Sequence, residues 1–227
     1  MVAAAGSGER LGSTLPKALV PLAGRPLLAH SLALASSLDG LALVSVAAPP
    51  GHIRDVEDIA RTVLPHLAVR AVAGGSTRQA SVRLALEAVP PDIEIVLCHD
   101  AARPFAARGS FERLVAILVG ADPSVAGAIP VVAPVDTVKR IAGGEIVETM
   151  ARGAVGLAQT PQAFRAGRLR EAHAAAARDG VEATDDAAVV ERSGGLVLAV
   201  PGDPANFKIT TAEDLDRAEH LATVVDA

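Results

Sequence analysis

The sequence predicts an α/β protein with a mostly parallel sheet, helices on both faces and a projecting β-hairpin arm. Continuous apolar runs of strand length alternate with helical patterns along the chain, which is typical of βα units. Most of these runs show no polar alternation, as expected for strands covered on both faces. We therefore expect residues 1–227 to form a single domain around one sheet.

The individual elements follow in order from these patterns. The apolar runs predict core strands at residues 1–5, 41–47, 69–72, 94–99, 125–131 and 196–200. The helical patterns cover residues 26–37, 53–64, 77–88, 110–119, 166–178, 185–193 and 212–221. Thr210 and Glu213 have the spacing of a capping box before the last helix. The first strand is short because a glycine loop follows at Gly6, which leaves open whether the natural start lies upstream.

One segment breaks the alternation and predicts the arm. Residues 135–140 and 145–150 flank Ala142-Gly143-Gly144, the pattern of a β-hairpin. The segment has too few large apolar residues to be a core element. We expect it, with its neighbours over about 134–156, to project and to pack on a second subunit in a homodimer.

Composition excludes several classes of function. Aromatic residues make up 2% of the chain, with no Tyr and no Trp, so aromatic platforms for stacked nucleic-acid bases are excluded. The net charge of −5, without a basic stripe, argues against nucleic acid as a partner. Cys98 alone cannot form an internal disulfide or a Cys-rich zinc site. No apolar run is long enough to cross a membrane and no signal-peptide pattern begins the chain, so we expect a cytoplasmic protein.

A glycine-rich loop, AAAGSGERLG at residues 3–12, follows the first strand. Such a loop lets backbone N–H groups approach phosphates. The dinucleotide fingerprint fails because Leu11 stands where its third glycine belongs, and the P-loop fails because Lys17 is followed by Ala18. Two cations, Arg10 and Lys17, flank the loop, which suits a triphosphate whose charge grows during a reaction. An ordinary βα turn with two surface cations is the alternative.

Two further segments offer ligand-binding groups. AGGSTRQAS at residues 73–81 combines a strand end, a glycine turn and a helix N-terminus, whose backbone donors suit a base edge or an anion; a plain turn with an N-cap is the alternative. Asp100 ends a central strand, where α/β sheets bind ligands, and is the best Mg²⁺ candidate. Arg103 suits a second anion. A capping Asp with a local Arg partner is the other interpretation, and His99 and Cys98 are interpreted as structural.

The remaining candidates are weaker when taken singly. Thr137 offers a hydroxyl at the start of the arm, and Lys208 lies near the sheet's end after the last core strand. A solvated hairpin face and an isolated surface lysine are the alternatives. Asp185-Asp186 is interpreted as an acidic helix start and not as a metal pair.

Taken in order, seven segments resemble one known family. They read AAGSGERLG…PK, VAGGSTRQASV, VLCHDAARP, APVDTVKR, QTPQAF, TDDAAVVE and NFKITTAEDL. Together they resemble the 2-C-methyl-D-erythritol 4-phosphate cytidylyltransferases. The resemblance implies a Rossmann-like nucleotidyltransferase fold with a mixed, mostly parallel twisted sheet, a homodimer joined through the arm and a requirement for Mg²⁺. It implies the reaction of CTP with methylerythritol phosphate, giving 4-diphosphocytidyl-2-C-methyl-D-erythritol and pyrophosphate in the non-mevalonate pathway of isoprenoid precursor synthesis.

The resemblance also assigns roles to residues. Arg10 and Lys17 would stabilise charge on the α-phosphate in the transition state, and Ser7 and Gly8 would cover the triphosphate. Residues expected to bind cytidine or the rest of CTP are Ala4, Ala5, Gly6, Gly75, Arg78, Ser81 and Ala101. Residues expected to bind the methylerythritol phosphate are Asp100, Arg103, Thr137 and Lys208. Asp100 is also expected to lie near the metal, and Arg152 is expected to reach the sugar phosphate across the dimer. The family usually has Gln where this chain has Ala18.

The expected chemistry is in-line attack of a sugar phosphate oxygen on the α-phosphorus of CTP. A phosphate monoester is already ionised at pH 7, so no general base is required, and catalysis is positioning plus electrostatics. Three alternatives remain open from the sequence. They are a cytidylyltransferase for another polyol phosphate such as ribitol 5-phosphate, a non-catalytic nucleotide-binding or scaffold protein, and a dinucleotide oxidoreductase, which the failed fingerprint at Leu11 disfavours.

Overall fold

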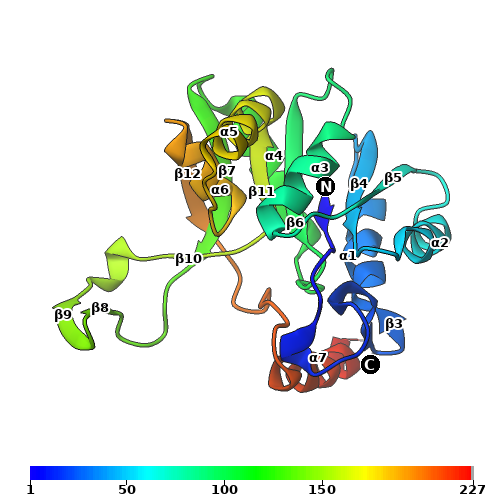
Figure 1. Cartoon of the computed structure of the whole chain (residues 1–227), viewed down its shortest axis with the longest axis horizontal. Coiled ribbons are helices and arrows are strands. Elements are labelled where there is room, and N and C mark those ends of the chain that lie inside the picture. Colours follow the sequence, from blue (N-terminus) through cyan, green and yellow to red (C-terminus); the bar gives the residue numbers. More distant parts are fainter. Residues whose placement is uncertain (226–227) are drawn as a thin grey trace.

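A computed structural model describes residues 1–225, and within them the chain forms a mixed, mostly parallel sheet with helices on both faces (Figure 1). The eight-stranded sheet has the order β10-β7-β11-β6-β1-β4-β5, and β12 also pairs with β7. Its strands are β1 (Val2–Ala3), β4 (Leu43–Ala48), β5 (Ala68–Ala73), β6 (Ile95–Asp100), β7 (Val125–Val132), β10 (Leu157–Ala158), β11 (Gln162–Arg165) and β12 (Leu196–Pro201). The predicted fold class is confirmed.

All seven predicted helices are present, with ends within a few residues of the prediction. They are α1 (Leu27–Ser36), α2 (Ile53–Val63), α3 (Arg78–Glu87), α4 (Arg108–Gly120), α5 (Ala166–Asp179), α6 (Asp186–Arg192) and α7 (Ala212–Val225). The cap of α7 lies one residue later than predicted. Asp214 accepts from the backbone N–H of Thr211, whose Oγ1 accepts in return from the N–H of Asp214. No helix within residues 1–225 is long and apolar enough to cross a membrane.

The apolar core lies on both faces of the sheet, and neighbouring strand residues divide between the two faces. Val96 and Phe164 point toward α3, α5 and α6, whereas Leu97 and Ala163 point toward α4. The helices α1 and α2 lie on the same face of the sheet as α4, where they pack on β4. Ala, Val, Leu and Ile fill most of this core, so small side chains replace the aromatic rings that the chain lacks.

The sheet differs from the prediction at three places, one of which is the unpredicted short strand β10. The first strand has only two residues, because the chain leaves the sheet after Ala3 to form the glycine loop. The prediction also missed β11, which lies antiparallel between β6 and β7. Its partners precede it by more than 30 residues, so no local pattern announces its pairing. Two short strands, β2 (Pro21–Leu22) and β3 (Arg25–Pro26), form a small separate hairpin.

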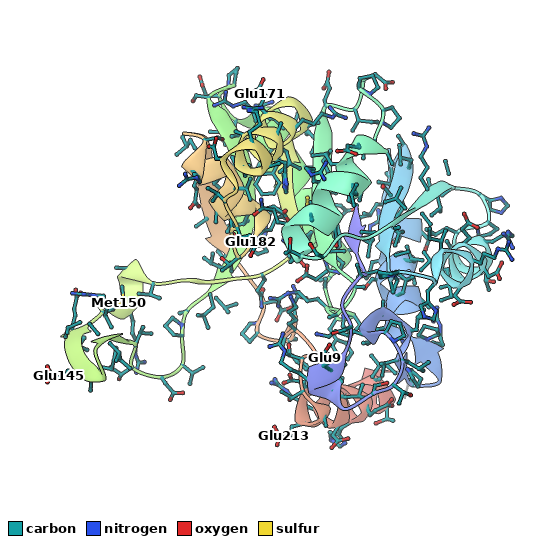
Figure 2. The ribbon with its side chains drawn as sticks, viewed as in Figure 1. Glu9, Glu145, Met150, Glu171, Glu182 and Glu213 are labelled. Carbon is teal, nitrogen blue, oxygen red and sulfur yellow. The ribbon has the colours of Figure 1, made fainter. Side chains whose placement is uncertain are left out.

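The predicted arm is a hairpin that extends from one side of the molecule (Figure 1). It consists of β8 (Lys139–Ala142) and β9 (Glu145–Thr149), so its first strand begins four residues later than predicted and includes Ala142. The turn needs only Gly143 and Gly144, whose positive φ values of 59° and 86° suit the tight turn of a hairpin. Figure 2 places the side chains of Glu145 and Met150 on this arm, away from Glu9 and Glu213.

Candidate active site

A cavity of about 540 Å³ lies where the glycine loop, the β5–α3 turn and the end of β6 meet. Parallel α/β sheets bind their ligands at this edge, at the carboxyl ends of the strands. Thirteen of the sixteen predicted site residues line it. They are Ala4, Ala5, Gly6, Ser7, Gly8, Arg10, Lys17, Gly75, Arg78, Ser81, Asp100, Ala101 and Lys208.

The glycine loop folds back on the segment that carries Lys17. The backbone N–H of Lys17 donates to the carbonyl of Gly6 at 3.1 Å. Gly8 has φ 85°, and a Cβ there would lie 3.0 Å from the carbonyl oxygen of Leu15. Only glycine therefore satisfies both the conformation and the space at this position. The result is a loop that lines the cavity with main chain and places Lys17 beside it.

Positive charge dominates the cavity. Among the described residues, its lining holds four cations, Arg10, Lys17, Arg78 and Lys208, against the carboxylates of Glu9 and Asp100. Burial lowers the pKa of Lys17 to about 8, and repulsion from Lys208 and Arg10 adds to that effect. The carboxylates of Asp100 and Asp214 oppose this shift but do not cancel it. The cavity is therefore suited to a polyanionic ligand.

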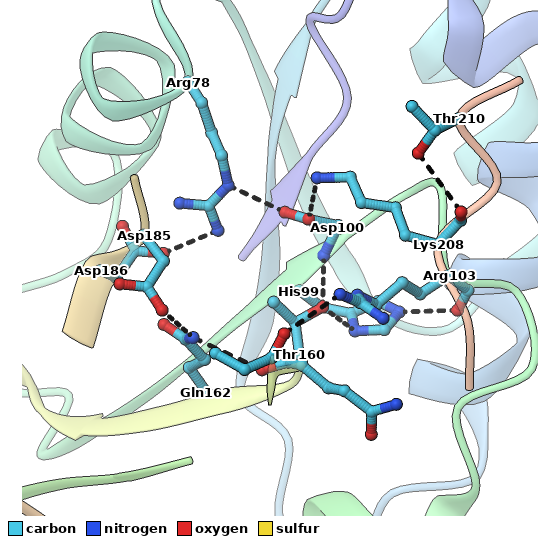
Figure 3. Close-up of polar contacts among 12 residues, drawn as sticks. Arg78, His99, Asp100, Arg103, Thr160, Gln162, Asp185, Asp186, Lys208 and Thr210 are labelled. Carbon is cyan, nitrogen blue, oxygen red and sulfur yellow. Dashed lines mark hydrogen bonds and ion pairs between the residues drawn. The ribbon is translucent and has the colours of Figure 1, made fainter. Parts of the chain in front are cut away.

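Asp100 is held between two of these cations (Figure 3). Its Oδ1 accepts from Nε of Arg78 at 3.0 Å, and its Oδ2 accepts from Nζ of Lys208 at 2.6 Å. Burial alone would raise the pKa of the Asp100 carboxyl, but the two cations outweigh it and hold the pKa well below its usual range. Asp100 is therefore ionised, and β6 presents it directly at the edge of the cavity.

Whether the site can hold a metal ion depends on the lone pairs that the Asp100 carboxylate still has available. Within residues 1–225, no three His, Cys, Asp or Glu side chains gather closely enough to hold a metal ion. A carboxylate has about four lone-pair sites, and the bonds to Arg78 and Lys208 use two of them. Mg²⁺ commonly takes one or two carboxylates together with water and substrate phosphates. The residues present therefore fit a Mg²⁺ ion that arrives with a nucleotide.

Ser81 supports the β5–α3 turn. Its Oγ accepts from the N–H of Gly75 at 3.1 Å and donates to the carbonyl of Thr77 at 2.8 Å. The side chain is buried, so its hydroxyl fixes the shape of the turn. The backbone of Gly75, together with Ala4, Ala5 and Gly6, then forms a wall of small residues along the cavity.

Three predicted site residues lie outside the cavity lining. Arg103 donates to the backbone carbonyls of Asn206 and Ala158 at 2.7 and 3.3 Å, so it links the loop at Asn206 to the end of β10. Thr137 and Arg152 are exposed and belong to the arm segment and the turn that follows it. Within one chain, the arm extends away from the glycine loop (Figure 1).

Other residues that the sequence interprets as structural are buried or cap a helix. His99 is buried, packs against Phe111 with ring centroids 5.2 Å apart, and lies 3.1 Å from Thr160 through Nδ1. Burial lowers the pKa of His99 to about 4, so it is neutral near pH 7, as suits a structural residue. Cys98 is a buried free thiol. Asp185 caps α6 by accepting from the N–H of Ala188 at 2.9 Å.

The contact between Asp186 and Arg78 was not predicted from the sequence. Nη2 of Arg78 donates to Oδ2 of Asp186 at 2.9 Å, across 108 residues of sequence. The acidic pair of residues 185–186 was the available signal, but the pattern alone indicates only a helix start. Thr210, which also lines the cavity, was missed because it was assigned to the capping of α7.

Comparisons with known proteins point to one family. The family model described as 2-C-methyl-D-erythritol 4-phosphate cytidylyltransferase matches residues 1–223. The Saccharopolyspora erythraea protein of that name is 43% identical, over 96% of both chains. The crystal structure of the Thermus thermophilus protein of that name has a TM-score of 0.77 at 37% identity, and the match covers 98% of this chain and 97% of that one.

Longer relatives also match. The Rhodospirillum rubrum protein named bifunctional enzyme IspD/IspF is 46% identical over 97% of this chain. This chain spans about half the length of such bifunctional relatives, 56% and 53% in two cases. The family model matches nearly the whole chain, and most of the predicted site residues line one cavity. The chain therefore belongs to the 2-C-methyl-D-erythritol 4-phosphate cytidylyltransferase family.

Proposed function

We propose that this chain transfers CMP from CTP to 2-C-methyl-D-erythritol 4-phosphate, releasing pyrophosphate. The observation that carries the proposal is the cavity at the carboxyl ends of β1 and β6, where four cations face two carboxylates beside a glycine loop. Two of the relatives above are named for methylerythritol phosphate, which favours this alcohol over ribitol 5-phosphate. The product would enter isoprenoid precursor synthesis, and the cytoplasmic location expected from the sequence stays a prediction.

The cytidine would bind along the small-residue wall. Ala4, Ala5, Gly6 and Gly75 bring main-chain donors and acceptors to the cavity, and Ala101 closes its floor. Such a wall lets the backbone recognise a base edge without an aromatic platform. Ser81 would act by holding the turn at Gly75 in place, and Ser7 and Gly8 would cover the triphosphate.

Transfer would depend on charge placed around the α-phosphate. Arg10 and Lys17 lie on the cavity lining, where they would stabilise the negative charge that grows as a sugar phosphate oxygen attacks the α-phosphorus and pyrophosphate leaves. The attacking phosphate is already ionised, which agrees with a buried, neutral His99 that takes no part. With a pKa of about 8, Lys17 is largely protonated at pH 7 in the free protein.

Asp100 would hold Mg²⁺ together with phosphate oxygens of CTP, because it is the carboxylate that β6 places in the cavity. When bound, the ion neutralises phosphate charge and helps to orient the triphosphate. Asp100, Lys208 and Arg103 would bind the methylerythritol phosphate. For Nη1 and Nη2 of Arg103 this requires exchanging a backbone carbonyl for phosphate, because these two groups now donate to Asn206 and Ala158.

A second copy of the chain would complete the site. The arm, residues 134–156, exposes large apolar side chains, with exposed fractions of 87% for Val135 and 64% for both Ile141 and Ile146. Exposed apolar surface on a projecting hairpin favours burial against a partner. Thr137 and Arg152 lie on this segment, so a homodimer joined through the arm would bring them to the other protomer's polyol phosphate.

The test is pyrophosphate release from CTP and Mg²⁺ with methylerythritol phosphate, with ribitol 5-phosphate, and with no alcohol. The proposal predicts release with the first alcohol and little with the second. A preference for ribitol 5-phosphate would support the other cytidylyltransferase. CTP binding without release in any mixture would support a non-catalytic nucleotide-binding protein.

A further inference from the structure

Asp186 is a buried carboxylate that lies outside the cavity lining but contacts a residue of that lining. Its side chain is 1% exposed and touches side chains from two other helices. Oδ2 accepts from Nη2 of Arg78 on α3, and Oδ1 lies 3.3 Å from Nε2 of His173 on α5. Because Asp186 is not part of the cavity lining, it can influence a ligand only through another side chain.

Arg78 is the side chain that makes this connection. Its Nη2 bonds to Asp186 at 2.9 Å while its Nε bonds to Asp100 at 3.0 Å (Figure 3). The guanidinium is planar and its donors point in fixed directions. A bond at Nη2 therefore also sets the direction of Nε–H. Without Asp186, a long side chain with much rotamer freedom would keep only its bond to Asp100.

The charges around Arg78 explain why a second carboxylate is needed. Arg78 begins α3, and a helix N-terminus disfavours a cation. Lys17, Lys208 and Arg10 line the same cavity. Burial would lower the pKa of Arg78, but the carboxylates of Asp100 and Asp186 outweigh it and raise the pKa above its ordinary value. Asp186 thus holds a cation at a place that would otherwise repel it.

We propose that Asp186 is a positioning residue: it fixes the Arg78 guanidinium, which in turn orients the Asp100 carboxylate toward Lys208 and the ligand. The kinetic test of this inference rests on the proposed function, whereas its spectroscopic test rests on the geometry alone. The competing explanation is a purely structural ion pair that helps α6 to pack and has no influence on the cavity.

Asp186→Asn and Asp185→Asn form a matched pair of variants. Both remove one charge at the start of α6, and Asp185 accepts from Ala188 and from Gln162 but does not touch Arg78. We expect Asp186→Asn to lower kcat/KM for methylerythritol phosphate about tenfold to a hundredfold, the range for a lost hydrogen bond to a charged group. Asp185→Asn should lower the melting temperature and leave kcat/KM within about twofold. Equal kinetic effects in the two variants would overturn the proposal.

A double mutant separates positioning from general destabilisation. If Asp186 acts through Arg78, then adding Asp186→Asn to Arg78→Lys should cause no further loss of kcat/KM, because the side chain that Asp186 holds has already been replaced. Losses that multiply would show that the two residues act independently, which contradicts the proposal.

The spectroscopic test uses the Nε–H resonance of Arg78, assigned by its disappearance in Arg78→Lys. We expect slow exchange of this proton with water in the wild-type chain and in Asp185→Asn, and fast exchange in Asp186→Asn. If Asp186→Asn fails to fold, fast exchange of this proton in the wild type would still overturn the proposal. If the wild type releases no pyrophosphate, the proposed function fails while this resonance still tests the positioning of Arg78.

Discussion

Lys17 provides the sharpest test of the electrostatic account, because its pKa places a charge change within an accessible pH range. With a pKa of about 8, about nine in ten Lys17 side chains of the free protein are charged at pH 7, and about one in ten at pH 9. Since kcat/KM reports the groups of the free enzyme, kcat/KM for CTP should fall about tenfold between these pH values. Bound triphosphate stabilises the cation, so kcat should fall less and at higher pH.

Two substitutions distinguish this titration from other alkaline effects. Lys17→Arg keeps the charge throughout, so its kcat/KM should stay flat between pH 7 and 9, although the wider guanidinium lowers its value. Lys17→Ala should lose about 10²–10³ in kcat and keep the fold. A parallel decline of wild type and Lys17→Arg above pH 8, or unchanged turnover in Lys17→Ala, would refute the reasoning.

The titration of Lys17 should raise stability with increasing pH, whereas it lowers kcat/KM. Burial lowers the folded-state pKa below the unfolded one, so between about pH 8 and 10 the unfolded chain binds more protons and the free energy of unfolding rises with pH. Lys17→Met removes this buried charge. It should therefore raise the melting temperature at pH 7 while most turnover is lost, and a lower melting temperature would contradict this explanation.

Three further predictions concern other parts of the site. Asp100→Asn leaves Lys208 and one donor of Arg78 without their carboxylate, so the free energy of unfolding in urea should fall by about 3 kcal/mol near pH 7. The depressed pKa of Asp100 means that this difference shrinks in strongly acidic solution, and a pH-independent difference would argue against the ion pairs. His99→Phe should keep kcat within about threefold, because the ring is buried and neutral, and a hundredfold loss would indicate a catalytic role. Ile141→Asp with Ile146→Asp should give a monomer by light scattering with a raised KM for methylerythritol phosphate and a nearly unchanged KM for CTP; a stable dimer would contradict the proposed role of the arm.

Local features could be predicted well from the sequence, because their signals are local. The glycine loop, the turn before α3 and the acidic end of β6 are each readable within about ten residues, and the cavity unites them. The seven helices follow from side-chain periodicity, which needs no knowledge of distant partners. The arm could also be predicted from the sequence. Its first strand, β8, begins four residues later than predicted, because the two-glycine turn sets the register.

Pairings between distant residues could not be predicted. Asp100 bonds to Lys208 and Arg78 bonds to Asp186, each across 108 residues, and nothing in a local pattern matches one cation to one carboxylate. The antiparallel β11 is four residues long and becomes a strand because β6 and β7 leave a place between them. Arg103 shows the same limit, since its backbone partners lie in a distant loop and at the end of β10.

The central claim is that an oxygen of the methylerythritol phosphate attacks the α-phosphorus that CTP supplies. The most direct measurement uses methylerythritol phosphate labelled with ¹⁸O in its phosphate group, with the products followed by ³¹P nuclear magnetic resonance. This attack predicts ¹⁸O in the bridge of the cytidine diphosphate product and none in pyrophosphate. A label in pyrophosphate, or pyrophosphate without a cytidine diphosphate product, would contradict it.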